Sequence, residues 1–207
     1  MQLRFSRREL VDLFAAWVAL SVAFTVFLNP YLLGGATVGL VDDVVETFLR
    51  QFVTSLGTVG VAFICHELAH KIVAVRFGQL ATFRADYGLL LLAIVSALAG
   101  FLFAAPGAVV HRGRITPRES GLISLAGPAS NLVLAAVFFA TTLVASPAVA
   151  DAAALGVTVN LLLAGFNMLP VGPLDGRTVV RWNRAVYVAV AVPSIALAVT
   201  ALFGIGF

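Results

Sequence analysis

Long apolar runs, separated by short polar segments, dominate this sequence. Most of these runs are close to the ~20 residues that a helix needs to cross a hydrocarbon core ~30 Å thick. Hydrophobic residues make up 61% of the chain and charged residues 11%, whereas soluble domains are about half apolar and a quarter charged. The sequence therefore predicts an all-α polytopic membrane protein with five to six membrane helices, folded as a single membrane-embedded domain over residues 1–207. The apolar runs cover approximately residues 9–28, 52–75, 89–110, 120–144, 152–168 and 186–203.

The formal net charge of +3 comes from basic residues that flank the apolar runs. Such flanking charges orient a membrane protein, so we expect no nucleic-acid partner. The single cysteine, Cys65, excludes an intrachain disulfide. A basic N-terminus before an apolar run also resembles a secretory signal, but the run is long and no small-x-small site follows Leu28. A retained first helix is therefore expected.

The charges between the runs constrain the topology. With the basic N-terminus in the cytoplasm, the acidic patch at 42–46 lies outside and the basic residues at 71–84 lie inside. If 89–110 then crossed the membrane, the basic patches at 111–118 and 177–184 would both lie outside.

A re-entrant third segment repairs this pattern, because both basic patches then lie inside. Irregular backbone is tolerated at membrane depth where it is buried in protein or lines a wet cavity, and Pro106-Gly107 suits such a turn. We therefore expect a multi-pass protein of the cell membrane with a cytoplasmic N-terminus. A plain sixth span over 89–110 is the alternative.

The motif that carries chemistry is His66-Glu67-Leu68-Ala69-His70, inside the second apolar run. Residues four apart on a helix lie on one face, one turn apart. Two imidazoles at that spacing can bind one Zn²⁺ at ~2.0–2.1 Å each, and Glu67 can reach a water molecule at the metal as a general base. The sequence thus predicts two zinc ligands and a base on one helical turn.

The membrane context strengthens this interpretation. An ionisable side chain at membrane depth costs at least ~2.5–3.5 kcal/mol on insertion scales, and this helix carries three within five residues. A metal ion would compensate by binding both imidazoles and pairing with the carboxylate through water. The alternative is a pair of hydrogen-bonded core histidines, or a helix end at the membrane interface.

A catalytic zinc needs a third protein ligand and an open position. Asp175 is the candidate, because Pro170 and Pro173 interrupt the helix before it and a new helix can start there. The alternative, a helix N-cap without metal, suits this aspartate equally well from local sequence. The topology favours the ligand: with 89–110 re-entrant, His66, His70 and Asp175 reach the same membrane face, whereas six spans would separate them by ~20–30 Å.

Two asparagines are further candidates. Asn167, at the end of the fifth run, could donate to the oxyanion of a tetrahedral intermediate or form an interhelical hydrogen bond. Asn131 stands among small residues, which favours a role in helix packing.

Taken together, the segments 66–70, 127–131 (GPASN) and 167–176 resemble the site-2 protease family of intramembrane zinc metalloproteases, in a compact form without PDZ or CBS domains. The resemblance implies one Zn²⁺ per chain with His66, His70 and Asp175 as ligands. It also implies Glu67 as the general base and Asn167 as a substrate or oxyanion contact. Family members cleave a transmembrane segment of a membrane protein substrate near the cytosolic face, in regulated intramembrane proteolysis.

The family also carries a short membrane-embedded sheet after the HExxH helix. The residues near Phe83 and at 105–110 are its expected counterpart, and their edge could pair with an unwound substrate. The chain departs from the family at Arg177, where a second glycine is frequent, and in the apolar stretch 89–105, which resembles an insertion.

Two other functions remain open at this point. Other membrane HExxH peptidases usually take a glutamate as third ligand, and the chain has none after Glu119. A non-catalytic metal-binding scaffold or transporter is the second alternative. The expected partners are the lipid bilayer and a transmembrane substrate, while the substrate's identity, the regulatory signal and the oligomeric state are not determined by the sequence.

Overall fold

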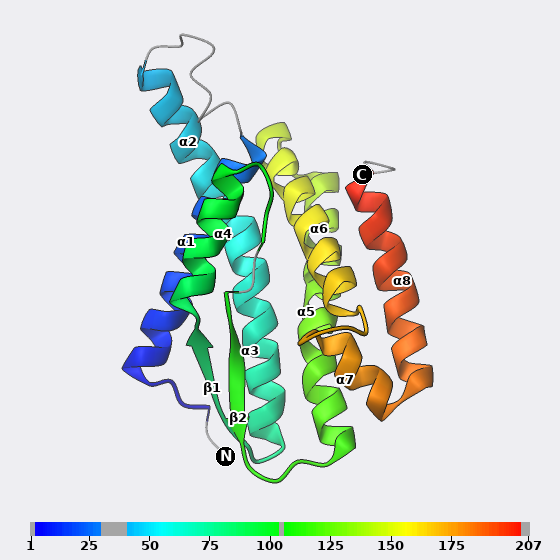
Figure 1. Ribbon diagram of the computed structural model, residues 1–207. Coiled ribbons are helices and arrows are strands. Elements are labelled where there is room, and N and C mark those ends of the chain that lie inside the picture. Colours follow the sequence, from blue (N-terminus) through cyan, green and yellow to red (C-terminus); the bar gives the residue numbers. More distant parts are fainter. Residues whose placement is uncertain (1–2, 30–40, 104–105, 204–207) are drawn as a thin grey trace. The chain divides into compact units, whose positions relative to one another are not determined.

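The computed structural model describes residues 3–29, 41–103 and 106–203, and most of them are helical (Figure 1). In chain order the elements are α1 (Arg7–Leu28), α2 (Val41–Ser55), the π-helical turn η2 (Leu56–Gly60), α3 (Val61–Arg76), β1 (Leu80–Ala85), α4 (Tyr87–Leu98), β2 (Gly107–Arg112), α5 (Pro117–Val144), α6 (Pro147–Asn167), α7 (Asp175–Trp182) and α8 (Arg184–Leu202).

Within the described residues, five helices are long and apolar enough to cross a membrane. They are α1, the continuous helix Val44–Arg76 that joins α2, η2 and α3, and the helices α5, α6 and α8. This confirms the predicted all-α polytopic fold.

Among its described residues, the third apolar run forms no helix long enough to cross a membrane. Its helical part, α4, has 12 residues and spans only ~18 Å at 1.5 Å rise per residue. The Asp86 carboxylate caps the start of α4 by accepting from the Leu89 N–H. Gly100, at φ +84°, follows Ala99 at the other end, in the left-handed conformation that commonly terminates helices. The re-entrant path of 89–110 stays a prediction.

The two strands form the expected small sheet after the HExxH helix. The Asp86 N–H donates to the Pro106 carbonyl at 3.1 Å. This bond joins the end of β1 to the start of β2, so the strands run antiparallel. Phe83 lies in β1 as expected, whereas Ala105 falls outside the described residues.

The chain divides into two compact units. Unit 1 takes in the described residues of Met1–Arg4, Ala62–Thr82 and Val109–Phe207. Unit 2 takes in those of Phe5–Val61 and Phe83–Ala108. The single domain predicted over residues 1–207 stays a prediction.

In unit 2, α1 packs against α2, η2 and α4. The Trp17 indole N–H donates to the Leu56 carbonyl of the π-helical turn at 2.9 Å. Two carboxylates of α1 are buried and have donors: Glu9 Oε1 accepts from the Phe83 N–H at 2.9 Å, and Asp12 accepts from the Tyr87 hydroxyl at 2.7 Å. These bonds explain how an apolar helix tolerates two buried acidic residues.

In unit 1, α6 packs against α5 and α8, and α7 packs against α5 and α8. Glycines let these helices approach closely. A Cβ at Gly165 would lie 2.5 Å from the Ala198 Cβ of α8, and a Cβ at Gly121 would overlap the Trp182 ring of α7.

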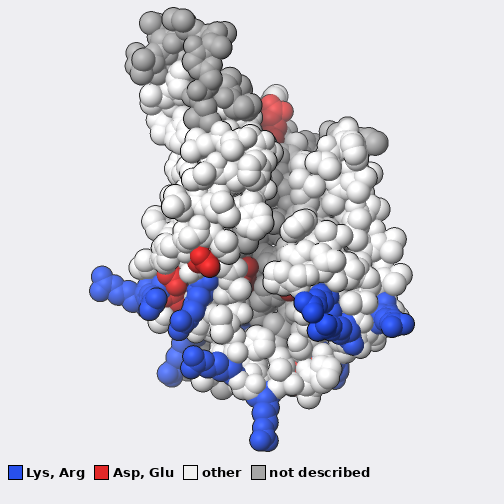
Figure 2. Space-filling model, viewed as in Figure 1, with Lys and Arg blue, Asp and Glu red and all other residues white. Residues whose placement is uncertain are grey.

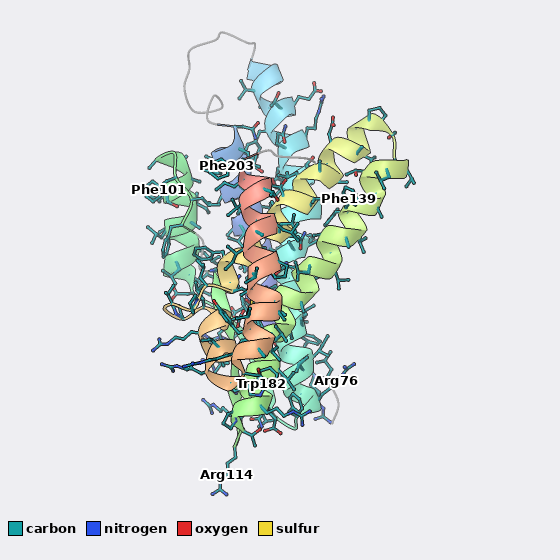
Figure 3. The ribbon with its side chains drawn as sticks, turned by 90° about the vertical axis from the view of Figure 1, so that its right-hand side faces the viewer. Arg76, Phe101, Arg114, Phe139, Trp182 and Phe203 are labelled. Carbon is teal, nitrogen blue, oxygen red and sulfur yellow. The ribbon has the colours of Figure 1, made fainter. Side chains whose placement is uncertain are left out.

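The two ends of unit 1 differ in charge. Figure 3 shows Arg76, Arg114 and Trp182 at one end, with Phe139 and Phe203 at the other. The surface of this unit in Figure 2 carries its basic side chains around the same lower end, near α7. Both basic patches of unit 1 therefore lie at one end, as the positive-inside rule requires for a single membrane face.

Candidate metal centre

Three side chains from α3 and α7 converge inside unit 1. His66 Nε2 and His70 Nε2 lie 3.0 Å apart. Asp175 Oδ2 lies 3.4 Å from the first of these nitrogens and 3.3 Å from the second. Both histidines are buried and the aspartate is half-buried. The topology that we inferred from the charges required this convergence.

The hydrogen bonds on the far side of each imidazole fix which nitrogen carries the proton. His66 Nδ1 lies 2.6 Å from Asn131 Oδ1, and His70 Nδ1 lies 2.7 Å from the Ile123 carbonyl oxygen. Both partners are acceptors, so each Nδ1 donates and each neutral imidazole presents the lone pair of Nε2 to the centre. Hydrogen-bond acceptors at the far ring nitrogen orient metal-binding histidines in many proteins.

The centre therefore holds two lone-pair nitrogens and a carboxylate oxygen, all acceptors, within 3.4 Å of one another. Acceptors repel at that distance unless a proton or a cation lies between them. Tetrahedral zinc with ligand bonds of ~2.0–2.2 Å places its ligand atoms ~3.3 Å apart. The observed spacings match that value, so His66, His70 and Asp175 fit a zinc ion, with one position left for water or substrate.

Gly127 of α5 keeps one side of the centre open. A Cβ at this position would overlap His70 Nε2 and lie 2.6 Å from His66 Nε2. Any other residue would place its side chain against the two nitrogen ligands. The close approach of α5 to α3 at this point therefore requires glycine.

Glu67 lies next to the first histidine and is buried, with 7% of its surface exposed. Among the described residues, no hydrogen-bond partner exists for its Oε2 atom. The backbone of Val109 in β2 lies close enough to interact with the carboxylate. A buried carboxylate oxygen without a donor is costly, and a water molecule at the metal would supply the missing donor.

Asp175 reaches the centre because α6 ends at Asn167 and a new helix begins eight residues later. The N-cap of α7 is Leu174 and Asp175 is the first helical residue, so the alternative of an aspartate N-cap is wrong by one position. Gly176 allows α7 to contact the Met168 carbonyl closely. Burial alone would raise the pKa of Asp175, but the adjacent imidazoles of His66 and His70 outweigh burial and lower this pKa to about 2.

Comparison with known proteins decides the family. The chain is 40% identical over 196 residues to a protein of Methanocaldococcus jannaschii that is provisionally named zinc metalloprotease MJ0611, and the match covers 93% of each chain. The chain belongs to the site-2 protease family of zinc metalloproteases. This confirms the resemblance found in its motifs.

Two further relatives of this site-2 protease carry the same provisional zinc metalloprotease name. Rip3 of Mycobacterium tuberculosis is 36% identical over 131 residues, covering 59% of this chain and 30% of Rip3. YwhC of Bacillus subtilis is 36% identical over 147 residues, covering 59% of this chain and 65% of YwhC. No protein-family model and no solved structure matches the chain.

The two candidate asparagines of this site-2 protease have different positions. Asn131 does more than pack helices, because it accepts from His66 and its Nδ2 donates to the Ala62 carbonyl at 3.2 Å. The signal that we missed is its spacing: Gly127 and Asn131 are four apart, so they share the face of α5 that meets α3. Asn167, the last residue of α6, donates from Nδ2 to the Leu163 carbonyl at 2.9 Å. Its role as an oxyanion contact stays a prediction.

Proposed function

We propose that this chain is an intramembrane zinc metalloendopeptidase that hydrolyses peptide bonds in or near transmembrane segments of membrane protein substrates. One observation carries the proposal. Three convergent acceptors, His66, His70 and Asp175, stand beside the buried carboxylate of Glu67, whose Oε2 atom has no hydrogen-bond partner among the described residues. Glu67 and both histidines lie on a helix that is long and apolar enough to cross a membrane.

Each residue has a chemical role in this proposal. Zinc, when bound, supplies Lewis acidity that polarises a carbonyl oxygen and lowers the pKa of water. Glu67 takes a proton from the attacking water as the water oxygen bonds to the scissile carbonyl carbon. Glu67 then returns that proton to the leaving nitrogen as the C–N bond breaks. The second N–H of the Asn167 amide is assigned to the developing oxyanion.

A helical substrate shields its own carbonyl groups, so the cleaved segment has to unwind before hydrolysis. The sheet offers a place for an extended segment by strand addition. The outer edge of β1 is occupied at Phe83 by the Glu9 carboxylate. The β2 backbone at Val109 lies beside Glu67. Each strand thus has a carboxylate at one backbone position, and we propose β2 as the edge that pairs with substrate because it lies next to the proposed base.

The basic end of unit 1 supports a cytoplasmic location for the active site. His70 lies six residues before Arg76, which is ~9 Å along α3, and Arg76 marks the basic end in Figure 3. By the positive-inside rule this end faces the cytoplasm. We propose that the protein lies in the cell membrane with a cytoplasmic N-terminus. Cleavage of its substrates would release cytosolic products, as in regulated intramembrane proteolysis.

The test is Glu67→Gln in the zinc-loaded chain, reconstituted with a transmembrane substrate. We expect zinc content to stay near one per chain and hydrolysis to fall by ~10²–10⁴-fold, because the amide cannot accept the proton. Glu46→Gln is the matched control, since the Glu46 side chain is 70% exposed and lies in unit 2. Undiminished cleavage by Glu67→Gln would refute the assignment, and a wild-type chain that binds no zinc would favour a non-catalytic scaffold.

A further inference from the structure

A chain of two buried amides leads away from the first zinc ligand. His66 Nδ1 donates to Asn131 Oδ1 at 2.6 Å. Asn131 Nδ2 donates to Asn160 Oδ1 at 2.9 Å, and Asn160 Nδ2 donates to the Gly156 carbonyl oxygen at 2.8 Å. Both asparagines have no exposed surface. The chain thus connects α3 through α5 to the backbone of α6.

Each bond in this chain has one permitted direction. The Gly156 carbonyl only accepts, so the amide of Asn160 has to point its nitrogen toward Gly156 and its oxygen toward Asn131. That oxygen only accepts, so Asn131 points its nitrogen toward Asn160 and its oxygen toward His66. His66 is left with one tautomer, in which Nδ1 carries the proton and Nε2 keeps its lone pair.

The second histidine is held differently. His70 Nδ1 donates directly to the Ile123 carbonyl, which the helix backbone orients. The Asn131 side-chain amide, which accepts the hydrogen bond from His66 Nδ1, can rotate by half a turn. Its nitrogen would then face His66. The Ala62 carbonyl also accepts from Asn131 Nδ2, but at 3.2 Å this bond is the longest in the network.

We propose that Asn160 is a positioning residue for the metal centre: by fixing the orientation of Asn131, it fixes the tautomer and ring position of the zinc ligand His66. The inference rests on the proposed zinc site and adds a residue of α6 that does not touch the metal. Replacing Asn160 should weaken zinc binding without removing a ligand. The comparable loss of an outer partner costs about 10–100-fold in metal affinity.

The test measures zinc affinity by chelator competition, and the visible absorption of the Co²⁺-substituted full chain, for wild type and Asn160→Leu. We expect the zinc Kd of Asn160→Leu to rise about 10–100-fold and the Co²⁺ bands to shift, because His66 is no longer held in one position. If Asn160→Leu does not fold, Asn160→Ser serves instead. A serine hydroxyl can donate to the Gly156 carbonyl within the helix, but the side chain is too short to accept a hydrogen bond from Asn131 Nδ2. The same loss of zinc affinity is therefore expected.

The matched control is Thr158→Val on the same helix. Thr158 is partly buried and its hydroxyl donates to the Ala154 carbonyl at 3.1 Å, a bond within the helix that leads to no ligand. This variant should keep the wild-type Kd and Co²⁺ spectrum. A double variant, Asn131→Leu with Asn160→Leu, should lose no more affinity than Asn131→Leu alone, because both act through one chain of bonds.

The proposal is overturned if a folded Asn160 variant keeps the wild-type Kd and spectrum, if Thr158→Val shifts them equally, or if the two asparagine substitutions act additively. A wild-type chain without zinc would instead overturn the proposed function on which the inference rests. Because these measurements do not use peptide hydrolysis, the two failures are distinguishable.

Discussion

Gly127→Ala tests the metal centre without removing any ligand. An alanine Cβ would lie 2.6 Å from His66 Nε2 and closer still to His70 Nε2. Non-bonded contacts need ~3.5 Å, so the overlap is about 1 Å. Zinc sites tolerate ligand displacements of only ~0.2 Å. Either the imidazoles or α5 must therefore move several times farther than the site allows.

The expected result is a loss of zinc from Gly127→Ala. We expect the chain to purify folded but with well below one zinc per chain. Its zinc Kd, measured by chelator competition, should rise by at least ~100-fold, the upper end of the effect of removing a hydrogen-bond partner of a metal ligand. The fold itself should lose about 1–3 kcal/mol, the usual cost of overpacking. Thermal unfolding of the zinc-free chains measures that second effect separately.

Gly165→Ala is the matched control for this prediction. Its Cβ would lie 2.5 Å from the Ala198 Cβ and 2.9 Å from the Ser194 carbonyl oxygen, which is a similar overlap between α6 and α8. The control should lose stability and keep its zinc affinity. If Gly127→Ala binds zinc as tightly as wild type, or if Gly165→Ala loses zinc equally, the geometry assigned to the centre is refuted.

Three further outcomes follow from the contacts. Asp175→Ala should abolish stoichiometric zinc in metal analysis, because only two protein ligands remain, and retention of one zinc per chain would exclude Asp175 as a ligand. Acidification should release zinc, because protons compete with the metal for its ligand atoms; since the pKa of Asp175 is lowered to about 2, protonation of this carboxylate should not be the step that releases the metal, and zinc release confined to pH values below about 3 would contradict this order. Trp17→Phe should destabilise the chain by about 1 kcal/mol in unfolding titrations, because the Leu56 carbonyl of the π-helical turn loses its donor, and its zinc affinity should not change.

The local features of the centre could be predicted from the sequence. The spacing of His66 and His70 places both on one helix face because an α-helix repeats every 3.6 residues, whatever surrounds it. The apolar runs predicted the membrane helices for a similar reason, since the bilayer thickness sets their length. Length alone would predict a sixth crossing helix at 89–110. The helix there has only 12 residues, because Asp86 caps its start and Gly100 follows its end.

The outer contacts of the centre could not be predicted in this way. Asn131 was interpreted as a packing residue, because nothing in its neighbours indicates that α5 turns this amide toward His66, 65 residues earlier in the chain. Asn160 gave no signal, since a single amide in an apolar helix is equally suited to an interhelical bond. Both roles depend on how three helices meet.

From the sequence alone we could predict membrane-spanning helices, and two candidate zinc ligands with a candidate base on one turn, because bilayer thickness and helix periodicity act locally. The charge pattern also predicted that Asp175 lies at the same end of the helices as both histidines, but it gave no distance. The packing of the helices is what brings Asp175 Oδ2 within 3.4 Å of both imidazoles and places the proton on the far nitrogen of each ring. Those properties arise from hydrogen bonds between residues far apart in sequence, and these exist only once α3, α5, α6 and α7 have packed.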